Sequence, residues 1–475
     1  MSVPSSPPGW CRNCNSALHT GADDHALKKL YIKNFGCQMN EYDAARIVDQ
    51  LQVNCGYQQT DHPEQADLIL FNTCHIREKA EEKLFSELGR LHKLVATARQ
   101  QAALPPALFA VGGCVAQATG AEIFRRAPFV RLVFGPQTYH RLPHMLARLE
   151  REGGQLCDAE IATESKFDEL PQSQRVGAIA SVTVQEGCNK FCAFCVVPYT
   201  RGREWSRPVQ DILTEVNHLV QHGAVEIQLL GQNVNAYQGM DSTGLVHDLA
   251  LLIRRVALLP GVQRLRFVTS HPADMNDDLV EIFADIPQLC AYFHLPIQSG
   301  SDRILERMGR GHSRADYLGW IDKLRAVHPD MAIASDFIVG FPGETEADFQ
   351  ETLHLVDAVS YDHAYSFCYS PRPGTQAASM ADAIPAPLSA ERLARLQERL
   401  NAHQLQRNQQ RVGRIEQVLV EGVAKKGSGE LTGRTPGFRK VNFPGPAEWI
   451  GRIVPVRISE GLPNSLRGQW TEPAA

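Results

Sequence analysis

The stretch QEGCNKFCAFCVVPYTRGREWSR, residues 185–207, decides the fold class of this chain. It places Cys188, Cys192 and Cys195 in the pattern C-x3-C-x2-C. A structural zinc site usually has four N/S ligands, most often as two separated pairs, and no second pair follows this motif. Three cysteines can instead hold a 4Fe-4S cluster and leave its fourth iron open. The spacing therefore favours an iron-sulfur cluster over zinc, with three chance cysteines in a buried loop as the alternative.

An aromatic residue, Phe194, stands directly before the last of these cysteines. With it, the motif closely resembles the radical-SAM superfamily signature. Reductive cleavage of S-adenosylmethionine requires an open iron that touches the cofactor, while the protein supplies position and excludes water. The resemblance implies that Cys188, Cys192 and Cys195 ligate this cluster, with Phe194 near the cofactor.

Length and composition indicate a protein with several domains. The chain has 475 residues, of which 43% are hydrophobic and 21% charged, and this length predicts about two to four domains. We find no apolar run of about 18 residues and no continuous apolar segment of a signal peptide near the start. We therefore expect a cytoplasmic protein, in which the twelve cysteines serve metal or redox chemistry in preference to disulfides.

Residues 1–26 are rich in Pro, Ser and Gly and predict a disordered, dispensable extension. They contain Cys11 and Cys14, which could form half of a metal site, but nothing nearby completes it.

Residues 27–150 predict an open parallel α/β domain, with strands at 30–35, 67–71 and 108–111. Each strand ends next to a cysteine, namely Cys37, Cys74 and Cys114. Ligands gather at the carboxyl ends of parallel strands, so these cysteines favour a second three-cysteine cluster over isolated buried thiols. The remaining cysteines, expected to be core or surface thiols, are Cys55, Cys157, Cys290 and Cys368.

Residues 151–175 read as a linker, and residues 176–406 predict a second α/β domain. Its expected strands are 179–184, 226–230, 265–269, 292–297, 332–339 and 364–369. Six strand-helix units are too few for a standard eight-fold barrel, so we expect a partial (β/α)6 barrel.

Polar residues at these strand ends are the candidates for binding the cofactor. We expect Gly231, Gln232, Asn233 and Ser270 to contact the methionine and ribose parts of S-adenosylmethionine. His271 stands beside a proline and is expected to cap a turn, with catalysis as the less favoured interpretation. Position alone makes three further residues candidates for cofactor or substrate contacts: Glu344, Arg201 and Arg203.

Residues 407–475 predict a small OB-like β-barrel, with strands at 418–420, 430–433, 440–443, 453–458 and 466–470. Residues 411–475 contain ten Lys and Arg against six Glu and no Asp, a net charge of +4, whereas the whole chain carries −5. A basic barrel on an acidic protein favours RNA binding, through phosphate contacts and stacking on Phe438 or Phe443. An incidental surface charge is the alternative. No phosphate-binding or dinucleotide-binding glycine motif is present, which argues against ATP or NAD chemistry.

Residues 27–470 together resemble the radical-SAM methylthiotransferases, and most closely their branch that modifies isopentenylated tRNA. The matching stretches are GCQMNEYD at 36–43, NTCHIREKA at 72–80, VVPYTRGRE at 196–204, HLPIQSGSD at 294–302, DFIVGFPGETE at 336–346 and GRTPGFRKVNFPG at 433–445. The extension with Cys11 and Cys14 is not part of the family pattern.

The resemblance implies two 4Fe-4S clusters and two molecules of S-adenosylmethionine per turnover. The cluster at Cys188, Cys192 and Cys195 would cleave the cofactor. The auxiliary cluster at Cys37, Cys74 and Cys114 would supply sulfur and accept a methyl group. The implied substrate is a tRNA adenosine next to the anticodon that already carries an N6-isopentenyl group. A 5′-deoxyadenosyl radical would remove hydrogen from C2 of this base, where the methylated sulfur is added.

Two other functions remain open at this point. A methylthiotransferase could act on threonylcarbamoylated tRNA or on an aspartate of a ribosomal protein, because the same cysteines serve all three reactions. A non-catalytic RNA-binding protein with structural zinc is the alternative from a different class. An electron donor protein and a source of replacement sulfur are further expected partners, and a monomer is the default oligomeric state.

Overall fold

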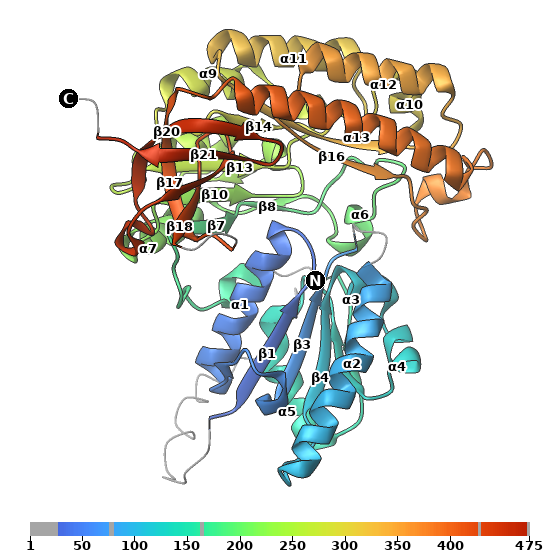
Figure 1. Cartoon of the computed structure of the whole chain (residues 1–475). Coiled ribbons are helices and arrows are strands. Elements are labelled where there is room, and N and C mark those ends of the chain that lie inside the picture. The colour runs from blue at the N-terminus through green and yellow to red at the C-terminus, as the bar shows by residue number, and fades with distance from the viewer. Residues whose placement is uncertain (1–26, 76–79, 162–165, 426–428, 473–475) are drawn as a thin grey trace, which may run out of the picture.

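A computed structural model describes residues 27–75, 80–161, 166–425 and 429–472. An N-terminal α/β domain, a six-stranded α/β barrel and a small β-barrel follow one another along the chain (Figure 1). Cys11 and Cys14 lie outside the described residues. None of the helices in the described part of the chain is long and apolar enough to cross a bilayer.

The N-terminal domain is built on a parallel sheet with the strand order β2-β1-β3-β4-β5-β6. The strands are β1 (Lys29–Asn34), β2 (Gln58–Gln59), β3 (Leu68–Thr73), β4 (Leu108–Gly113), β5 (Val130–Phe134) and β6 (Leu156–Asp158). The helices are α1 (Gln38–Cys55), α2 (Ala80–Gln101), α3 (Cys114–Thr119), α4 (Glu122–Arg126) and α5 (Leu142–Glu152). The predicted open parallel sheet is confirmed, and β6 lies in the segment that was expected to be a linker.

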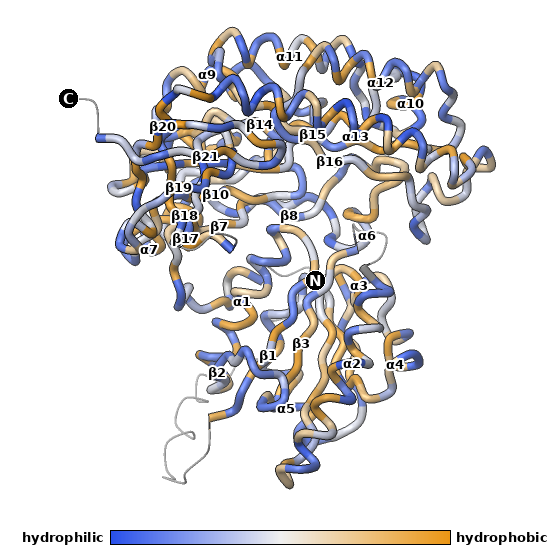
Figure 2. Tube along the Cα trace, viewed as in Figure 1, coloured by the Kyte–Doolittle hydropathy of each residue, from blue (hydrophilic) through white to orange (hydrophobic). Residues whose placement is uncertain are grey.

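Helices cover both faces of this sheet. Alternate residues of each strand point to opposite faces, so each strand contributes to two apolar layers. Leu68 and Leu70 of β3 pack with α1 and α5, whereas Ile69 and Phe71 pack with α2. Figure 2 shows β3 and β4 as hydrophobic strands in the centre of the domain. A sheet buried on both faces needs continuous apolar strands of this kind.

The central domain is the predicted partial (β/α)6 barrel. Its six strands are β7 (Ile179–Thr183), β10 (Glu226–Leu230), β13 (Arg264–Val268), β14 (Tyr292–His294), β15 (Ala332–Val339) and β16 (His363–Cys368). They pair in two parallel three-stranded sheets, β7-β10-β13 and β14-β15-β16. The helices are α6 (Val197–Thr200), α7 (Val209–Gln221), α8 (Leu249–Ala257), α9 (Asp277–Asp285), α10 (Asp302–Arg307), α11 (Arg314–Val327) and α12 (Glu346–Val359). Short strands β8 (Gln185–Glu186) and β9 (Trp205–Ser206) frame the cysteine loop, and β11 (Gln238–Met240) pairs with β12 (Val246–Asp248).

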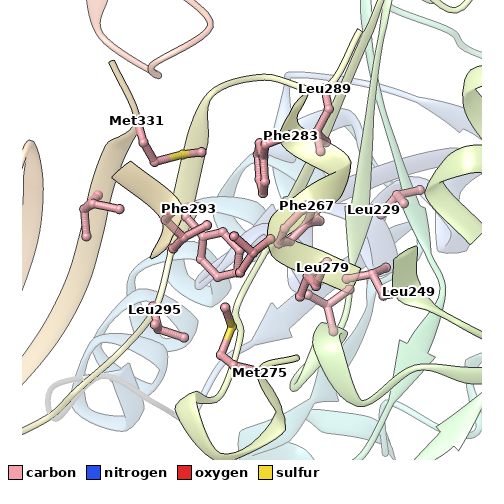
Figure 3. Close-up of a cluster of buried hydrophobic side chains, with 14 of the residues drawn as sticks. Leu229, Leu249, Phe267, Met275, Leu279, Phe283, Leu289, Phe293, Leu295 and Met331 are labelled. Atoms are coloured by element: carbon pink, nitrogen blue, oxygen red, sulfur yellow. The ribbon is translucent and has the colours of Figure 1, made fainter. Parts of the chain in front are cut away.

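Buried apolar side chains between the barrel strands and the outer helices hold this domain together. Figure 3 shows Phe267 of β13, Phe283 of α9 and Phe293 of β14 in one cluster, in which each ring packs on the other two. The Phe267 and Phe293 rings meet edge to face with their centroids 5.2 Å apart, a favoured geometry for aromatic pairs.

Helix α13 (Ala386–Gln409) leads into a closed five-stranded barrel with the strand order β17-β18-β19-β21-β20. Its strands are β17 (Ile415–Val423), β18 (Glu430–Arg434), β19 (Lys440–Pro444), β20 (Ile453–Leu462) and β21 (Ser465–Trp470). The predicted small C-terminal barrel is confirmed.

The prediction that Phe443 stacks on RNA bases is wrong, and the half-buried Phe438 makes contacts within the protein. Phe443 is fully buried in its apolar core, where it packs with Val418 and Val441. Phe438 packs on Tyr292 of β14, and the Arg266 guanidinium lies over its ring. Phe443 is therefore a core residue, and Phe438 joins the C-terminal barrel to the central domain.

Candidate iron-sulfur and cofactor site

A pocket lies between the N-terminal domain and the central barrel. The N-terminal domain contributes Cys37, Gln38, Met39, Asn40, Cys74, His75 and Cys114 to its lining. The central domain contributes Val196, Val197, Thr200, Arg201, Leu230, Gly231, Gln232, Val268 and Thr269. The three N-terminal cysteines thus share one pocket with residues that follow Cys195 and with the carboxyl ends of β10 and β13.

The convergence of the N-terminal cysteines follows from strand register. Asn34 of β1 lies opposite Asn72 of β3, and Thr73 lies opposite Gly113 of β4, so the three strands end side by side. The Asn72 side chain also donates to the Asn40 carbonyl oxygen at 2.7 Å and ties the start of α1 to the end of β3. The cysteines that follow these strands are thereby brought to one edge of the sheet.

Glycines before two of these cysteines let the backbone approach closely. Gly36 has φ 141°, and a Cβ there would lie 2.4 Å from the Cys74 Cβ. Gly113 has φ 90°, and a Cβ there would lie 2.4 Å from the Thr73 carbonyl oxygen. Both positions are therefore closed to a side chain, and glycine there lets the backbone before Cys37 and Cys114 pack directly on Thr73 and Cys74.

The electrostatic environment of this pocket differs between its thiols. A hydrogen bond from Cys74 lowers the pKa of Cys37 to about 6, aided by the Arg201 charge and opposed by burial. Burial raises the pKa of the Cys114 thiol, and Arg201 acts in the opposite direction. A thiolate is the form that ligates metal, and Arg201 favours it at both cysteines.

The second set of cysteines lies on the loop between β8 and α6. The Cys195 amide donates to the Cys192 carbonyl oxygen at 2.9 Å. Burial raises the pKa of Cys188 to about 11 and that of Cys195 to about 12. The Arg310 Nη1 lies 3.4 Å from the Cys192 sulfur, and the His271 Nε2 lies 3.9 Å from it.

Neither set of cysteines has the arrangement of a single-ion site. Within the described residues, no three His, Cys, Asp or Glu side chains are grouped closely enough to hold one metal ion. A structural zinc ion draws all its ligands to about 2.0–2.3 Å from one centre, whereas cluster ligands bind different irons. Three thiol donors in each set are the ligands of a cluster that keeps one iron open.

The structure brings two of the predicted cofactor residues, Gly231 and Gln232, into the pocket lining. The Gln232 Oε1 accepts from the Gly187 amide at 2.5 Å and so links the end of β10 to the cysteine loop. Asn233 donates to Asp274 Oδ2 at 2.7 Å. Ser270 is buried, and its Oγ has no hydrogen-bond partner among the described residues.

Three other candidates lie away from the lining of this pocket. Phe194 packs against an apolar cluster that contains Phe341. Glu344 is buried and paired with Arg392. Arg203 is exposed.

His271 caps a turn, as the favoured interpretation held. Its Nδ1 accepts from the Ala273 amide at 3.2 Å. Burial and then the Arg310 charge lower its pKa to about 2, which keeps the ring neutral.

Sequence reasoning missed Arg310 and Lys166. Arg310 is remote from Cys192 along the chain and reaches it only through the fold. Lys166 forms ion pairs with Asp43 and Glu186 in the interior, where a lysine is rarely found without such partners. No periodicity or motif marks either residue.

Comparison with known proteins identifies the family. The model of the Radical SAM superfamily matches residues 182–356, that of the uncharacterized protein family UPF0004 matches residues 29–135, and that of the TRAM domain matches residues 409–471. A relative from Magnetococcus marinus, named tRNA-2-methylthio-N(6)-dimethylallyladenosine synthase, is 60% identical over 93% of this chain and 100% of its own length. The chain belongs to this synthase family.

A second relative carries the same name and aligns over nearly its whole length. The synthase from Stenotrophomonas maltophilia K279a is 52% identical over 94% of this chain and 93% of its own length. The family resemblance inferred from the sequence motifs is thereby confirmed, and the chain is a radical-SAM enzyme of the methylthiotransferase type.

Two solved structures share the fold of this synthase family member. The radical S-adenosylmethionine methyltransferase TsrM from Kitasatospora setae has a TM-score of 0.54 at 13% identity, over 74% of this chain and 77% of its own. The cobalamin-dependent radical enzyme OxsB has a TM-score of 0.53 at 13% identity, over 79% of this chain and 56% of its own.

Proposed function

We propose that this enzyme adds a methylthio group to C2 of N6-isopentenyladenosine next to the anticodon of tRNA. The single observation that carries the proposal is the shared pocket, in which Cys37, Cys74 and Cys114 face the carboxyl ends of barrel strands. Membership in the synthase family, with relatives at 50–60% identity, supports tRNA as the substrate.

Two cysteine sets would hold two 4Fe-4S clusters. Cys188, Cys192 and Cys195 would hold one cluster together with S-adenosylmethionine, and Cys37, Cys74 and Cys114 would hold the auxiliary cluster. When bound, these groups supply a cofactor-derived radical and transferable sulfur. A radical is needed because an aromatic C–H is too weak an acid for a side-chain base.

The side chains around the pocket would position the cofactor and exclude water. Gly231 and Gln232 line the pocket and are proposed to contact S-adenosylmethionine directly. Asn233 and Ser270 would shape the same strand ends, and Phe194 would pack beneath the cluster loop. The Arg310 guanidinium, buried beside Cys192, would stabilise the thiolate there.

The anticodon loop is proposed to dock on strand β16, at the free edge of the sheet β14-β15-β16. Ala364 and Cys368 pack on the apolar core, so Tyr365 and Phe367 face the other way, and they are 56% and 47% exposed. They border a hollow that the Gln397 amide of α13 also lines. Aromatic faces stack on unpaired bases and amides can bond base edges, so this surface fits a single-stranded loop.

The C-terminal barrel is proposed to contact the tRNA backbone. Among the described residues of this domain, the exposed basic side chains are Arg414, Lys425, Lys440, Arg452, Arg457 and Arg467. Salt-sensitive phosphate contacts of this kind position an RNA without reading its sequence.

The functional units would follow the expected boundaries, 27–150 for the auxiliary cluster, 176–406 for the radical-SAM core and 407–475 for RNA. An electron donor protein and a sulfur source would act on a cytoplasmic monomer.

Iron counting and a nucleoside assay test the proposal. We expect about eight irons per chain after anaerobic reconstitution, and about four in the Cys188/Cys192/Cys195→Ala variant. Isopentenylated tRNA should gain the methylthio nucleoside, whereas threonylcarbamoylated tRNA and ribosomal protein should not. Zinc in place of iron, or methylthiolation of either alternative substrate alone, would contradict the assignment.

A further inference from the structure

Four buried charged side chains lie directly beside the three-cysteine pocket. Arg201 donates from Nη2 to Asp43 Oδ2 at 2.6 Å and from Nη1 to Glu186 Oε1 at 3.1 Å. Lys166 lies between the same carboxylates, with its Nζ 2.6 Å from Glu186 Oε1 and 3.4 Å from Asp43 Oδ1. We call Asp43, Lys166, Glu186 and Arg201 the buried charge cluster.

The buried charge cluster connects both sets of cysteines. Asp43 belongs to α1, whose N-cap is Cys37. Glu186 lies in β8, just before Cys188, and Arg201 ends α6, which begins just after Cys195. Through Asp43, Arg201 therefore contacts the N-terminal domain. Through Glu186, it contacts the segment that leads into the cysteine loop of the central domain.

The geometry of this cluster is fixed by its burial. All four side chains are at most 4% exposed, and two cations balance two anions. Gln137 also donates to Glu186 Oε2 at 3.2 Å and to the Arg201 carbonyl oxygen at 3.0 Å. Buried charges are tolerated only when paired and hydrogen-bonded in this way, so Arg201 has little freedom to turn.

Arg201 is also part of the pocket wall, together with Cys37 and Cys114, and its charge interacts with both thiols. A guanidinium carries five N–H donors in a rigid fork. Nη1 and Nη2 of Arg201 each donate a hydrogen bond to a carboxylate. Other N–H groups of the guanidinium remain to donate to sulfur atoms on the pocket side.

We propose that Arg201 is a positioning residue of the auxiliary cluster. Its guanidinium donates hydrogen bonds to sulfur beside Cys37 and Cys114 and thereby sets the reduction potential of that cluster. The inference rests on the proposed function, because it requires a cluster at these cysteines. Hydrogen bonds to sulfur and nearby positive charge favour the reduced form of an iron-sulfur cluster. Asp43 and Glu186 hold the donor in place.

The experiment compares two buried arginines in the Cys188/Cys192/Cys195→Ala background, where only the auxiliary cluster can form. Arg201→Lys keeps the charge and removes the fork of donors. Arg207→Lys is the matched control, since Arg207 is also buried and donates to Glu215 Oε2 at 2.6 Å and to the Thr183 carbonyl oxygen at 2.8 Å, outside the pocket lining. Potentiometric titration followed by electron paramagnetic resonance should give a lower potential for Arg201→Lys and an unchanged one for Arg207→Lys.

An unchanged potential in Arg201→Lys, or an equal shift in both variants, would overturn the inference. If Arg201→Lys loads no iron, Asp43→Asn is compared with the double variant Asp43→Asn, Arg201→Gln, which removes one charge of each sign from the buried charge cluster. The double variant should have the lower potential, because it alone lacks the guanidinium, and equal potentials would overturn the inference. A background protein without iron would refute the auxiliary cluster itself, whereas a potential independent of Arg201 refutes only its role.

Discussion

The Phe438 ring, in the C-terminal barrel, packs on the Tyr292 ring of β14 with their centroids 5.0 Å apart. The Arg266 and Arg434 guanidinium groups lie 4.7 and 4.4 Å from the centre of the Phe438 ring. Arg266 also donates to the Pro436 carbonyl oxygen at 3.0 Å. One half-buried aromatic side chain thus joins the domain proposed to bind RNA to the catalytic barrel.

We expect Phe438→Ala to lower the free energy of unfolding by about 1–3 kcal/mol, because it removes these ring contacts and leaves a partial cavity. Urea denaturation monitored by tryptophan fluorescence measures this. Phe443→Ala serves as the contrast, since it empties the barrel core and should cost about 3–5 kcal/mol. An unchanged free energy of unfolding in Phe438→Ala would contradict a stabilising contact of this ring between the two domains.

The double variant Tyr365→Ala, Phe367→Ala should bind an isopentenylated anticodon stem-loop at least tenfold more weakly, because loss of a base stacking contact costs about 1–3 kcal/mol. Fluorescence anisotropy measures the affinity. Tyr365→Phe keeps the stacking face and should bind like the parent, as should Leu258→Ala at an exposed apolar position. Full affinity in the double variant would remove β16 from the RNA surface.

His363 makes the interface with the C-terminal barrel sensitive to acid. Burial and then the Arg439 charge lower its pKa from 6.5 to about 4, while its Nε2 lies 3.1 Å from the Gly437 carbonyl oxygen. Below pH 6.5 the unfolded chain binds a proton that the folded protein does not, so stability falls as the pH is lowered from 6.5 towards 4. Urea midpoints measured across this range should fall less steeply in His363→Gln, and parallel slopes would contradict the assignment.

The strand ends show what a sequence can predict about this site. The alternation of strands and helices, with a cysteine after each strand, was enough to bring Cys37, Cys74 and Cys114 together. Contacts between remote segments, such as the pairing of Asp43 with Arg201, leave no local pattern. The prediction for Phe443 was wrong, although its burial could have been predicted. Val441 and Phe443 stand two residues apart in β19, and apolar residues with a period of two indicate a strand face that points into the core.

Glu344 is predicted from the sequence to contact the cofactor, but its side chain forms an ion pair with Arg392 away from the pocket lining. Its carboxylate accepts from Arg392 Nη1 at 2.8 Å and from the Gly340 amide at 3.0 Å, and both side chains of the pair are buried. Removing one partner of a buried ion pair costs about 3–5 kcal/mol, so Arg392→Met should destabilise the enzyme by this amount. Glu344→Gln combined with Arg392→Met should recover much of the loss, because the glutamine needs no counter-charge and still accepts from Gly340.

The Michaelis constant for S-adenosylmethionine separates this structural role from direct binding. We expect Glu344→Gln to leave this Michaelis constant within about twofold of the parent value. A twofold change corresponds to about 0.4 kcal/mol, which is less than the loss of a hydrogen bond to the cofactor would cost. By contrast, Gln232→Ala, which removes a side chain from the pocket lining, should raise the Michaelis constant. A tenfold increase in Glu344→Gln, with the double variant no better, would show that this carboxylate reaches the cofactor after all, through a rearrangement that breaks its pair with Arg392.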